Sequence, residues 1–137
     1  MLLDTNIVIY AINSASPKHR QAQKFIREYQ SSLKIAHQNI FEALRVLTHP
    51  HFSNPATTDK ALKAVGNITS GLSIIYPVFE TYYLAVQLIK KYCLDSDKVF
   101  DAYLAATAIT NNIQTIATDN TKDFRIMNEI KAYSPFL

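Results

Sequence analysis

Short apolar runs alternate with segments of helical periodicity along most of the chain, and this alternation limits the possible folds more than any other feature. Four of the runs are typical of strands, at residues 1–4, 33–37, 72–76 and 113–118. Strands separated by helices usually pair in parallel, so the pattern predicts an α/β domain: a central, mainly parallel sheet with helices on both faces. Because no repeat or linker interrupts the pattern, residues 1–137 are expected to form a single domain.

The segments between these runs place apolar residues three or four positions apart, as one buried face of a helix requires. Helices are expected at residues 17–29, 40–47, 55–66, 78–93, 100–108 and 124–130. Ser16 is expected to cap the first of them, with Pro17 at its first position, and Ser96 is expected to cap the helix that contains Phe100. Residues 5–12 fit either a continuation of the first strand or a first helical turn.

Composition indicates where the protein is located and argues against several kinds of cofactor chemistry. The chain is 48% hydrophobic and 18% charged, with no apolar stretch long enough to span a bilayer and no secretory signal, so we expect a cytoplasmic protein without a membrane partner. The single cysteine, Cys93, has no partner for an internal disulfide and is expected to be a small buried thiol. With only Gly66 and Gly71, the chain lacks a glycine-rich phosphate loop, which argues against ATP, GTP or dinucleotide chemistry.

Five acids follow the predicted strands at their carboxyl ends or lie in the first turns of the helices beyond them. These acids are Asp4, Glu42, Asp101, Asp119 and Asp123. The carboxyl ends of parallel strands meet at one edge of the sheet, where ligands of such folds bind, so these acids are expected to converge. Each acid alone has a structural explanation, because acids cap helices, and Glu42 could pair with Arg45 on a surface. Asp4 is harder to explain in this way, since apolar residues flank it on both sides.

Converging carboxylates repel one another, so the cluster is expected to hold protons or to bind a cation. Oxygen ligands without clustered histidine or cysteine favour Mg²⁺ or Mn²⁺. The four histidines have no zinc-type spacing and are expected at the surface or at helix ends; they are His19, His37, His49 and His51.

The charge balance favours a polyanionic partner. The net charge is +3, and the sequence pI is about 9.0. If Asp4, Glu42, Asp101 and Asp123 bind a metal, the remaining seven acids are opposed by fourteen lysines and arginines. An acidic pocket within a basic surface suits a phosphodiester chain.

Four stretches of the sequence resemble one known family. They are LLDTNIVIY at 2–10, QNIFEALRVLTHP at 38–50, KVFDAYLAATA at 98–108 and TDNTKDF at 118–124. In this order and spacing the chain resembles PIN-domain ribonucleases, specifically the VapC-like toxins of bacterial toxin–antitoxin pairs. The resemblance implies a three-layer α/β/α fold with a sheet of four or five strands.

The resemblance also implies roles for individual residues. Asp4, Glu42 and Asp101 match the metal-binding acids of the family, and the fourth acid is either Asp119 or Asp123. The polar residues that match positions orienting these acids are Asn6, Thr118 and Asn120. The implied reaction is hydrolysis of RNA phosphodiester bonds by water that one or two Mg²⁺ or Mn²⁺ ions activate.

Partners follow from the same resemblance, which implies a homodimer and inhibition by a small cognate antitoxin. Lysines and arginines near the cleft would position the RNA, and the candidates are Arg45, Lys98 and Lys122. Most of the aromatic residues that could form protein interfaces are instead expected in the core; the four considered are Phe25, Tyr29, Tyr82 and Tyr83.

Two other functions remain open at this stage. One is a non-catalytic PIN-like module that binds RNA or protein. The other is a phosphohydrolase that uses Asp4 as a nucleophile, although such enzymes need a second acid two residues further on, where this chain has Asn6.

Overall fold

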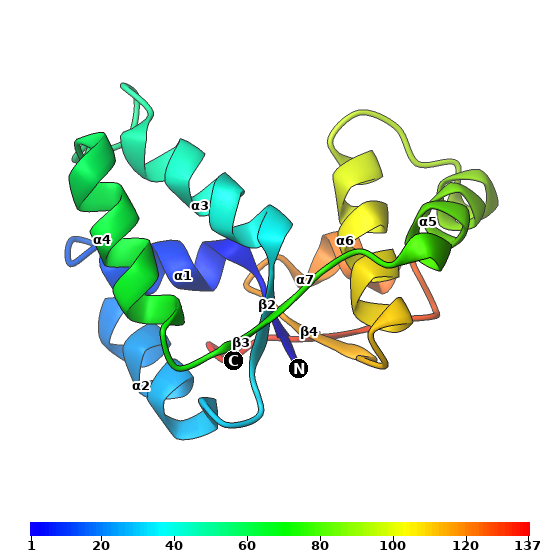
Figure 1. Ribbon diagram of the computed structural model, residues 1–137, viewed down its shortest axis with the longest axis horizontal. Helices are drawn as coiled ribbons and strands as arrows, with labels where there is room; N and C mark the ends of the chain where they lie inside the picture. Colours follow the sequence, from blue (N-terminus) through cyan, green and yellow to red (C-terminus); the bar gives the residue numbers. More distant parts are fainter.

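The computed structural model describes residues 1–137 and contains a five-stranded, fully parallel sheet between two groups of helices (Figure 1). The strands are β1 (Leu2–Leu3), β2 (Lys34–Ala36), β3 (Ser73–Ile75), β4 (Thr115–Ala117) and β5 (Lys131–Tyr133). Their order in the sheet is β3-β2-β1-β4-β5, which puts the N-terminal strand at the centre. The predicted α/β class and parallel sheet are confirmed.

The helices divide by their place in the sequence. One side carries α1 (Thr5–Ile12), α2 (His19–Tyr29), α3 (His37–Thr48) and α4 (Thr58–Thr69). The other side carries α5 (Phe79–Tyr92), α6 (Lys98–Thr110) and the short α7 (Thr121–Arg125), as Figure 1 shows. None of them combines the length and the apolar character needed to cross a membrane.

Each side of the sheet has its own hydrophobic core, because successive side chains of a strand point to opposite faces. Leu2 packs with α5 and α6, whereas its neighbour Leu3 packs with α1 to α4. The same division separates Ile116 from Ala117 in β4. Strands buried on both faces must be continuously apolar, which explains why the sequence predicts them as unbroken hydrophobic runs.

Of the two alternatives for residues 5–12 the helix is confirmed: these residues form α1, and the Asp4 carboxylate accepts the Thr5 N–H at 2.7 Å at its start. A short helix after β4 is confirmed, but its expected bounds of 124–130 are wrong, since α7 begins at Thr121 and ends at Arg125. Beyond it the N–H of Met127 bonds to the carbonyl of Phe124, and a second such three-residue step, from Ile130 to Met127, follows instead of a helical ladder.

Both expected serine caps are wrong. Helix α2 begins at His19, and Ser16 instead accepts the Lys18 N–H with its hydroxyl and the His19 N–H with its carbonyl, in a turn that precedes the helix. Ser96 has a left-handed backbone, with φ of 49°, and Asp97 separates it from the first residue of α6.

Two further expectations, about which side chains are buried, are wrong. Cys93 is exposed and not buried, because it ends α5 in a left-handed conformation at the surface. Phe25 is buried as expected, but the exposed fractions of Tyr29, Tyr82 and Tyr83 are 41%, 66% and 54%. The outer face of α5 is therefore aromatic. The histidines lie at the surface or at helix ends, as expected.

Candidate functional site

Four predicted acids come from four different elements around the carboxyl edge of the sheet. Asp4 directly follows β1, and Glu42 lies on α3, the helix that follows β2. Asp101 lies in the first turn of α6, and Asp123 lies on α7, just beyond β4. The chain connections of a parallel sheet thus bring together acids that are up to 119 positions apart in the sequence.

Asp4 is held by a set of hydrogen-bond donors. Its Oδ1 accepts the Thr5 N–H at 2.7 Å and lies 3.4 Å from Nδ2 of Asn39. Its Oδ2 accepts the Thr118 hydroxyl at 2.7 Å and the Asn6 side-chain amide at 3.1 Å. These donors fix the position of a carboxylate that its surroundings largely shield from water.

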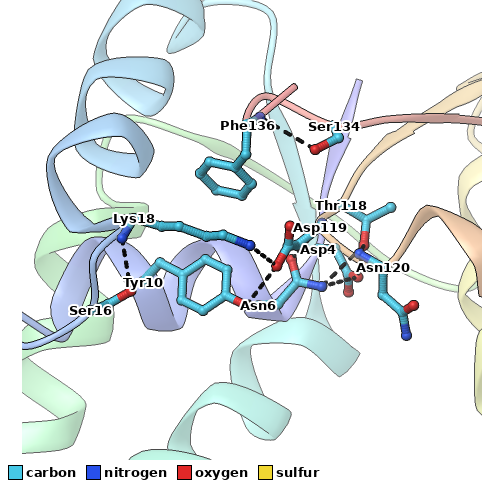
Figure 2. Close-up of polar contacts among 10 residues, drawn as sticks. All are labelled: Asp4, Asn6, Tyr10, Ser16, Lys18, Thr118, Asp119, Asn120, Ser134 and Phe136. Carbon is cyan, nitrogen blue, oxygen red and sulfur yellow. Dashed lines mark hydrogen bonds and ion pairs between the residues drawn. The ribbon is translucent and has the colours of Figure 1, made fainter.

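Thr118, which directly follows β4, is hydrogen-bonded to residues that follow the neighbouring strand β1, as Figure 2 shows. Besides donating to Asp4, its hydroxyl accepts from the Asn6 side chain and from the backbone N–H of Asn120, both at 3.0 Å. The side-chain amide oxygen of Asn6, Oδ1, accepts the backbone N–H of Asp119 at 3.2 Å. Asn120 also donates to the carboxylate of Asp123. The three predicted orienting residues therefore contact the acids or one another.

Glu42 has both carboxylate oxygens hydrogen-bonded. Oε2 accepts the Thr5 hydroxyl at 2.8 Å, and Oε1 accepts the Gln38 amide at 2.9 Å. Asn39 is fully buried; it donates to the Thr5 hydroxyl and accepts the N–H of Ala36. Thr5, Gln38 and Asn39 were not predicted as site residues. A helical spacing of four between Gln38 and Glu42 is the only sequence signal that points to any of them.

Charges among the four acids affect the pKa of two of them, Asp4 and Asp101. Burial raises the pKa of Asp4, and Glu42 and Asp123 raise it further, against the hydrogen bonds from Thr118 and Thr5. Burial, followed by the charges of Asp123, Asp4 and Glu42, raises the pKa of Asp101 to about 6. Burial and the neighbouring acids thus oppose the ionisation of Asp4 and Asp101, and a bound cation would offset this repulsion.

Asp119 belongs to a different network (Figure 2). Lys18 Nζ lies 2.5 Å from its carboxylate, and the Tyr10 hydroxyl donates to the same oxygen at 2.8 Å. Burial alone raises the pKa of Asp119, but the hydrogen bonds and charge of these partners outweigh it and lower the pKa below its usual value. Asp119 does not contribute to the raised pKa of Asp4 or Asp101, whereas Asp123 contributes to both.

The donor set suits a hard divalent cation, because it offers several carboxylate oxygens and no histidine or cysteine. As placed, no three His, Cys, Asp or Glu side chains have the spacing needed to hold one ion. The charges of the acids are close enough to raise the pKa of Asp4 and Asp101, but the carboxylates do not surround a single point. Binding one ion through three of them therefore requires side-chain movement.

The three cationic residues predicted to contact RNA are all exposed. Arg45 lies on the last turns of α3, Lys98 begins α6, and Lys122 lies on α7. None of them takes part in an ion pair, so their charges remain available to a polyanion.

Comparison with known proteins places this geometry in a family. Residues 1–129 match the family model of the PIN domain. The fold is similar to VapBC2 from Rickettsia felis bound to a DNA fragment from its promoter, with 20% identity, a TM-score of 0.74, and coverage of 97% of this chain and 96% of that chain. It is also similar to DNA-bound VapBC from Salmonella typhimurium, with 17% identity, a TM-score of 0.75, and coverage of 98% and 96%.

A third similar structure is VapC20 from Mycobacterium tuberculosis, described as a Sarcin-Ricin loop cleaving toxin, with 13% identity, a TM-score of 0.70, and coverage of 94% and 97%. No curated protein matches the chain significantly in sequence. The family match over residues 1–129 agrees with the fold and with the sequence motifs, and the chain belongs to the PIN-domain family.

Proposed function

We propose that this protein is a metal-dependent endoribonuclease and the toxin of a type II toxin–antitoxin pair. The observation that carries the proposal is the placement of Asp4, Glu42, Asp101 and Asp123 at one edge of the sheet, from four separate parts of the chain, where their charges raise the pKa of Asp4 and Asp101. The similar structures support the biological setting, since they include VapBC complexes and a toxin that cleaves the Sarcin-Ricin loop.

The four acids would hold Mg²⁺ or Mn²⁺, with Asp123 and not Asp119 as the fourth. When bound, such ions supply an activated water nucleophile and stabilise the charge that develops on a phosphodiester during hydrolysis. Asn6 and Thr118 keep Asp4 in place through the hydrogen bonds described above, and Thr5 and Gln38 do so for Glu42. The expected products carry 5′-phosphate and 3′-hydroxyl ends.

The proposal also assigns residues that contact RNA, protein partners and a location. Arg45, Lys98 and Lys122 would contact the RNA backbone, because they are exposed cations without acidic partners. We propose a cognate antitoxin and a homodimer as protein partners and the cytoplasm as the location. The exposed aromatic residues of α5 offer surface for such contacts.

The direct test is incubation of purified protein with total RNA in Mg²⁺, in Mn²⁺ or in EDTA. The wild-type protein should cleave in either metal and not in EDTA, and Asp4→Asn should lower the rate at least about 100-fold. Asp59→Asn is the matched control, since it removes an exposed acid at the start of α4, and it should cleave normally. Equal cleavage by wild type and Asp4→Asn would refute the proposal.

The test also separates the alternatives. An aspartate-nucleophile phosphohydrolase would form an acyl-phosphate on Asp4, but Asn6 donates a hydrogen bond to that carboxylate and supplies no second acid. A non-catalytic module would bind RNA in the presence or absence of metal and leave it intact.

A further inference from the structure

A pocket of about 360 Å³ lies between the start of α3 and helix α6, and Gln38 in its lining is hydrogen-bonded to Glu42. Its lining is mostly aromatic and apolar, and includes His37, Gln38, Phe41, Pro77, Phe100 and Tyr103. Its volume is at the low end of the range for small-molecule sites, roughly 300–1,000 Å³, so it suits one small planar group better than an extended chain.

Gln38 contains the only buried side-chain nitrogen or oxygen atom in the structure without a hydrogen-bond partner, its Oε1. The amide orientation is fixed, because Nε2 lies between two acceptors, Oε1 of Glu42 at 2.9 Å and the Phe100 carbonyl at 3.2 Å. Turning the amide over would place Oε1 against both acceptors. A buried acceptor left unpaired is unfavourable. Oε1 has almost no accessible surface as placed, so a small shift of the Gln38 side chain toward the pocket would let it accept an N–H group from a ligand.

The aromatic lining is unusually open to solvent. Phe41 is 66% exposed and Phe100 is 57% exposed, although both line the pocket. Exposed aromatic rings are the surfaces on which unpaired bases of single-stranded RNA stack. Phe100 directly precedes Asp101, and Phe41 directly precedes Glu42, so the rings flank two of the four acids in the sequence.

We infer that this pocket binds one unstacked nucleobase of the RNA substrate, next to the cleaved bond. The base would stack on Phe41 or Phe100 and donate an N–H from its edge to Oε1 of Gln38. This inference rests on the proposed nuclease function and adds a specificity site to it. Because Gln38 also donates to Glu42, the residue that reads the base would help to hold one of the acids.

The test measures binding separately from cleavage. All proteins carry Asp101→Asn, which keeps the RNA intact, and the probe is a fluorescein-labelled pool of random RNA octamers whose bound fraction is sequenced. Phe41→Ala and Phe100→Ala should each weaken binding about tenfold, since stacking of one base on an aromatic side chain is lost. Phe79→Ala is the control, because Phe79 is 79% exposed on α5 and does not line the pocket; binding should change less than about twofold.

Gln38→Leu tests the hydrogen bond. The parent protein should enrich particular bases at one position of the bound octamers, and Gln38→Leu should remove that enrichment while retaining most of the affinity. Normal binding by both phenylalanine variants, or unchanged enrichment in Gln38→Leu, would overturn the inference. Variants that bind RNA normally but lose a cognate antitoxin would show a protein-docking site and would also overturn it.

The same proteins without Asp101→Asn distinguish failure of the proposed nuclease function from failure of the proposed base site. If the otherwise wild-type chain binds RNA through the pocket but does not cleave it, the nuclease function fails and the base site stands. If it cleaves RNA while the pocket variants bind with unchanged affinity and enrichment, only the base site fails.

Discussion

At the scale of single residues, Asp4 is a nearly buried carboxylate whose hydrogen bonds keep it in place but do not fully offset the cost of burying its charge. Four donors surround it, yet burial and two neighbouring acids still raise its pKa. Hydrogen bonds therefore set the position of the charge, and a cation is left to balance it.

The raised pKa of Asp101, about 6, predicts a pH-dependent stability for metal-free protein. A carboxyl whose folded-state pKa is raised contributes stability at low pH that is lost as pH rises from about 4 to about 6. Asp101→Asn should therefore raise the urea midpoint in EDTA at pH 7.5, and the gain should shrink at pH 4.5. A gain of equal size at both pH values would contradict the raised pKa of Asp101.

Thr118→Val should destabilise the protein by about 1–3 kcal/mol, because the side chains of Asp4 and Asn6 and the backbone N–H of Asn120 lose a buried partner. Cleavage should also fall, since Asp4 loses one of its donors. Thr107→Val is the matched control: Thr107 is equally buried, but its hydroxyl only bonds back to the Tyr103 carbonyl of the same helix. Equal urea midpoints for the two variants would argue against the role of Thr118.

At the scale of elements, the Lys18–Asp119 pair connects the segment before α2 to the loop after β4. Tyr10 from α1 joins it, and Lys18 Nζ lies 5.3 Å from the Tyr10 ring centre and 5.0 Å from that of Phe136 (Figure 2). This network explains why Asp119 is kept apart from the other acids, and it gives the residue a structural role.

Tyr10→Phe should cost about 1 kcal/mol, because it removes one hydrogen bond to Asp119 and keeps the ring that packs edge-on against Phe136. RNA cleavage should be unchanged. Tyr29→Phe provides the comparison, since Tyr29 is exposed and its hydroxyl makes no hydrogen bond within the protein. A strong loss of cleavage in Tyr10→Phe without a loss of stability would place Asp119 in the reaction after all.

Sequence patterns located the strands that lie within apolar runs. β1, β2 and β4 are enclosed on both faces and therefore appear as unbroken apolar runs. The edge strand β3 was found in the same way, from the run at residues 72–76, although two of its three side chains are exposed. The other edge strand, β5, was not located, because it reads Lys-Ala-Tyr and contains no apolar run. The nature of α1 stayed open because Ile7, Val8 and Ile9 are all buried, which leaves no polar face to reveal a helical period.

The candidate site was predicted only as far as charge and position in the chain allow. Acids after strands are visible in a sequence, and four of them are electrostatically coupled in the structure. Thr5 and Asn39 could not be found, since their contacts depend on how α1 and α3 approach each other. The choice between Asp119 and Asp123 depended on Lys18, which is 101 positions away from Asp119.

At the scale of the whole molecule, two hydrophobic cores share one sheet. Leu2 and Leu3 are adjacent in the chain, but each belongs to a different core. Neither group of helices can lose its packing without exposing one face of the same strands, so the cores should depend on each other.

Urea unfolding should therefore be a single cooperative transition. Far-UV circular dichroism, which reports all helices, and tyrosine fluorescence should give the same midpoint. Two separated transitions would show that the helices on the two faces fold independently and that the chain does not behave as one domain.

The central claim is that acids from distant parts of the chain together bind a divalent metal ion. Calorimetric titration with Mn²⁺ tests this claim most directly. Wild-type protein should bind Mn²⁺, and Asp101→Asn should weaken binding at least about tenfold. Asp119→Asn should stay within about twofold of wild type, because Asp119 is paired with Lys18. Binding that survives Asp101→Asn, or that disappears in Asp119→Asn, would contradict the account.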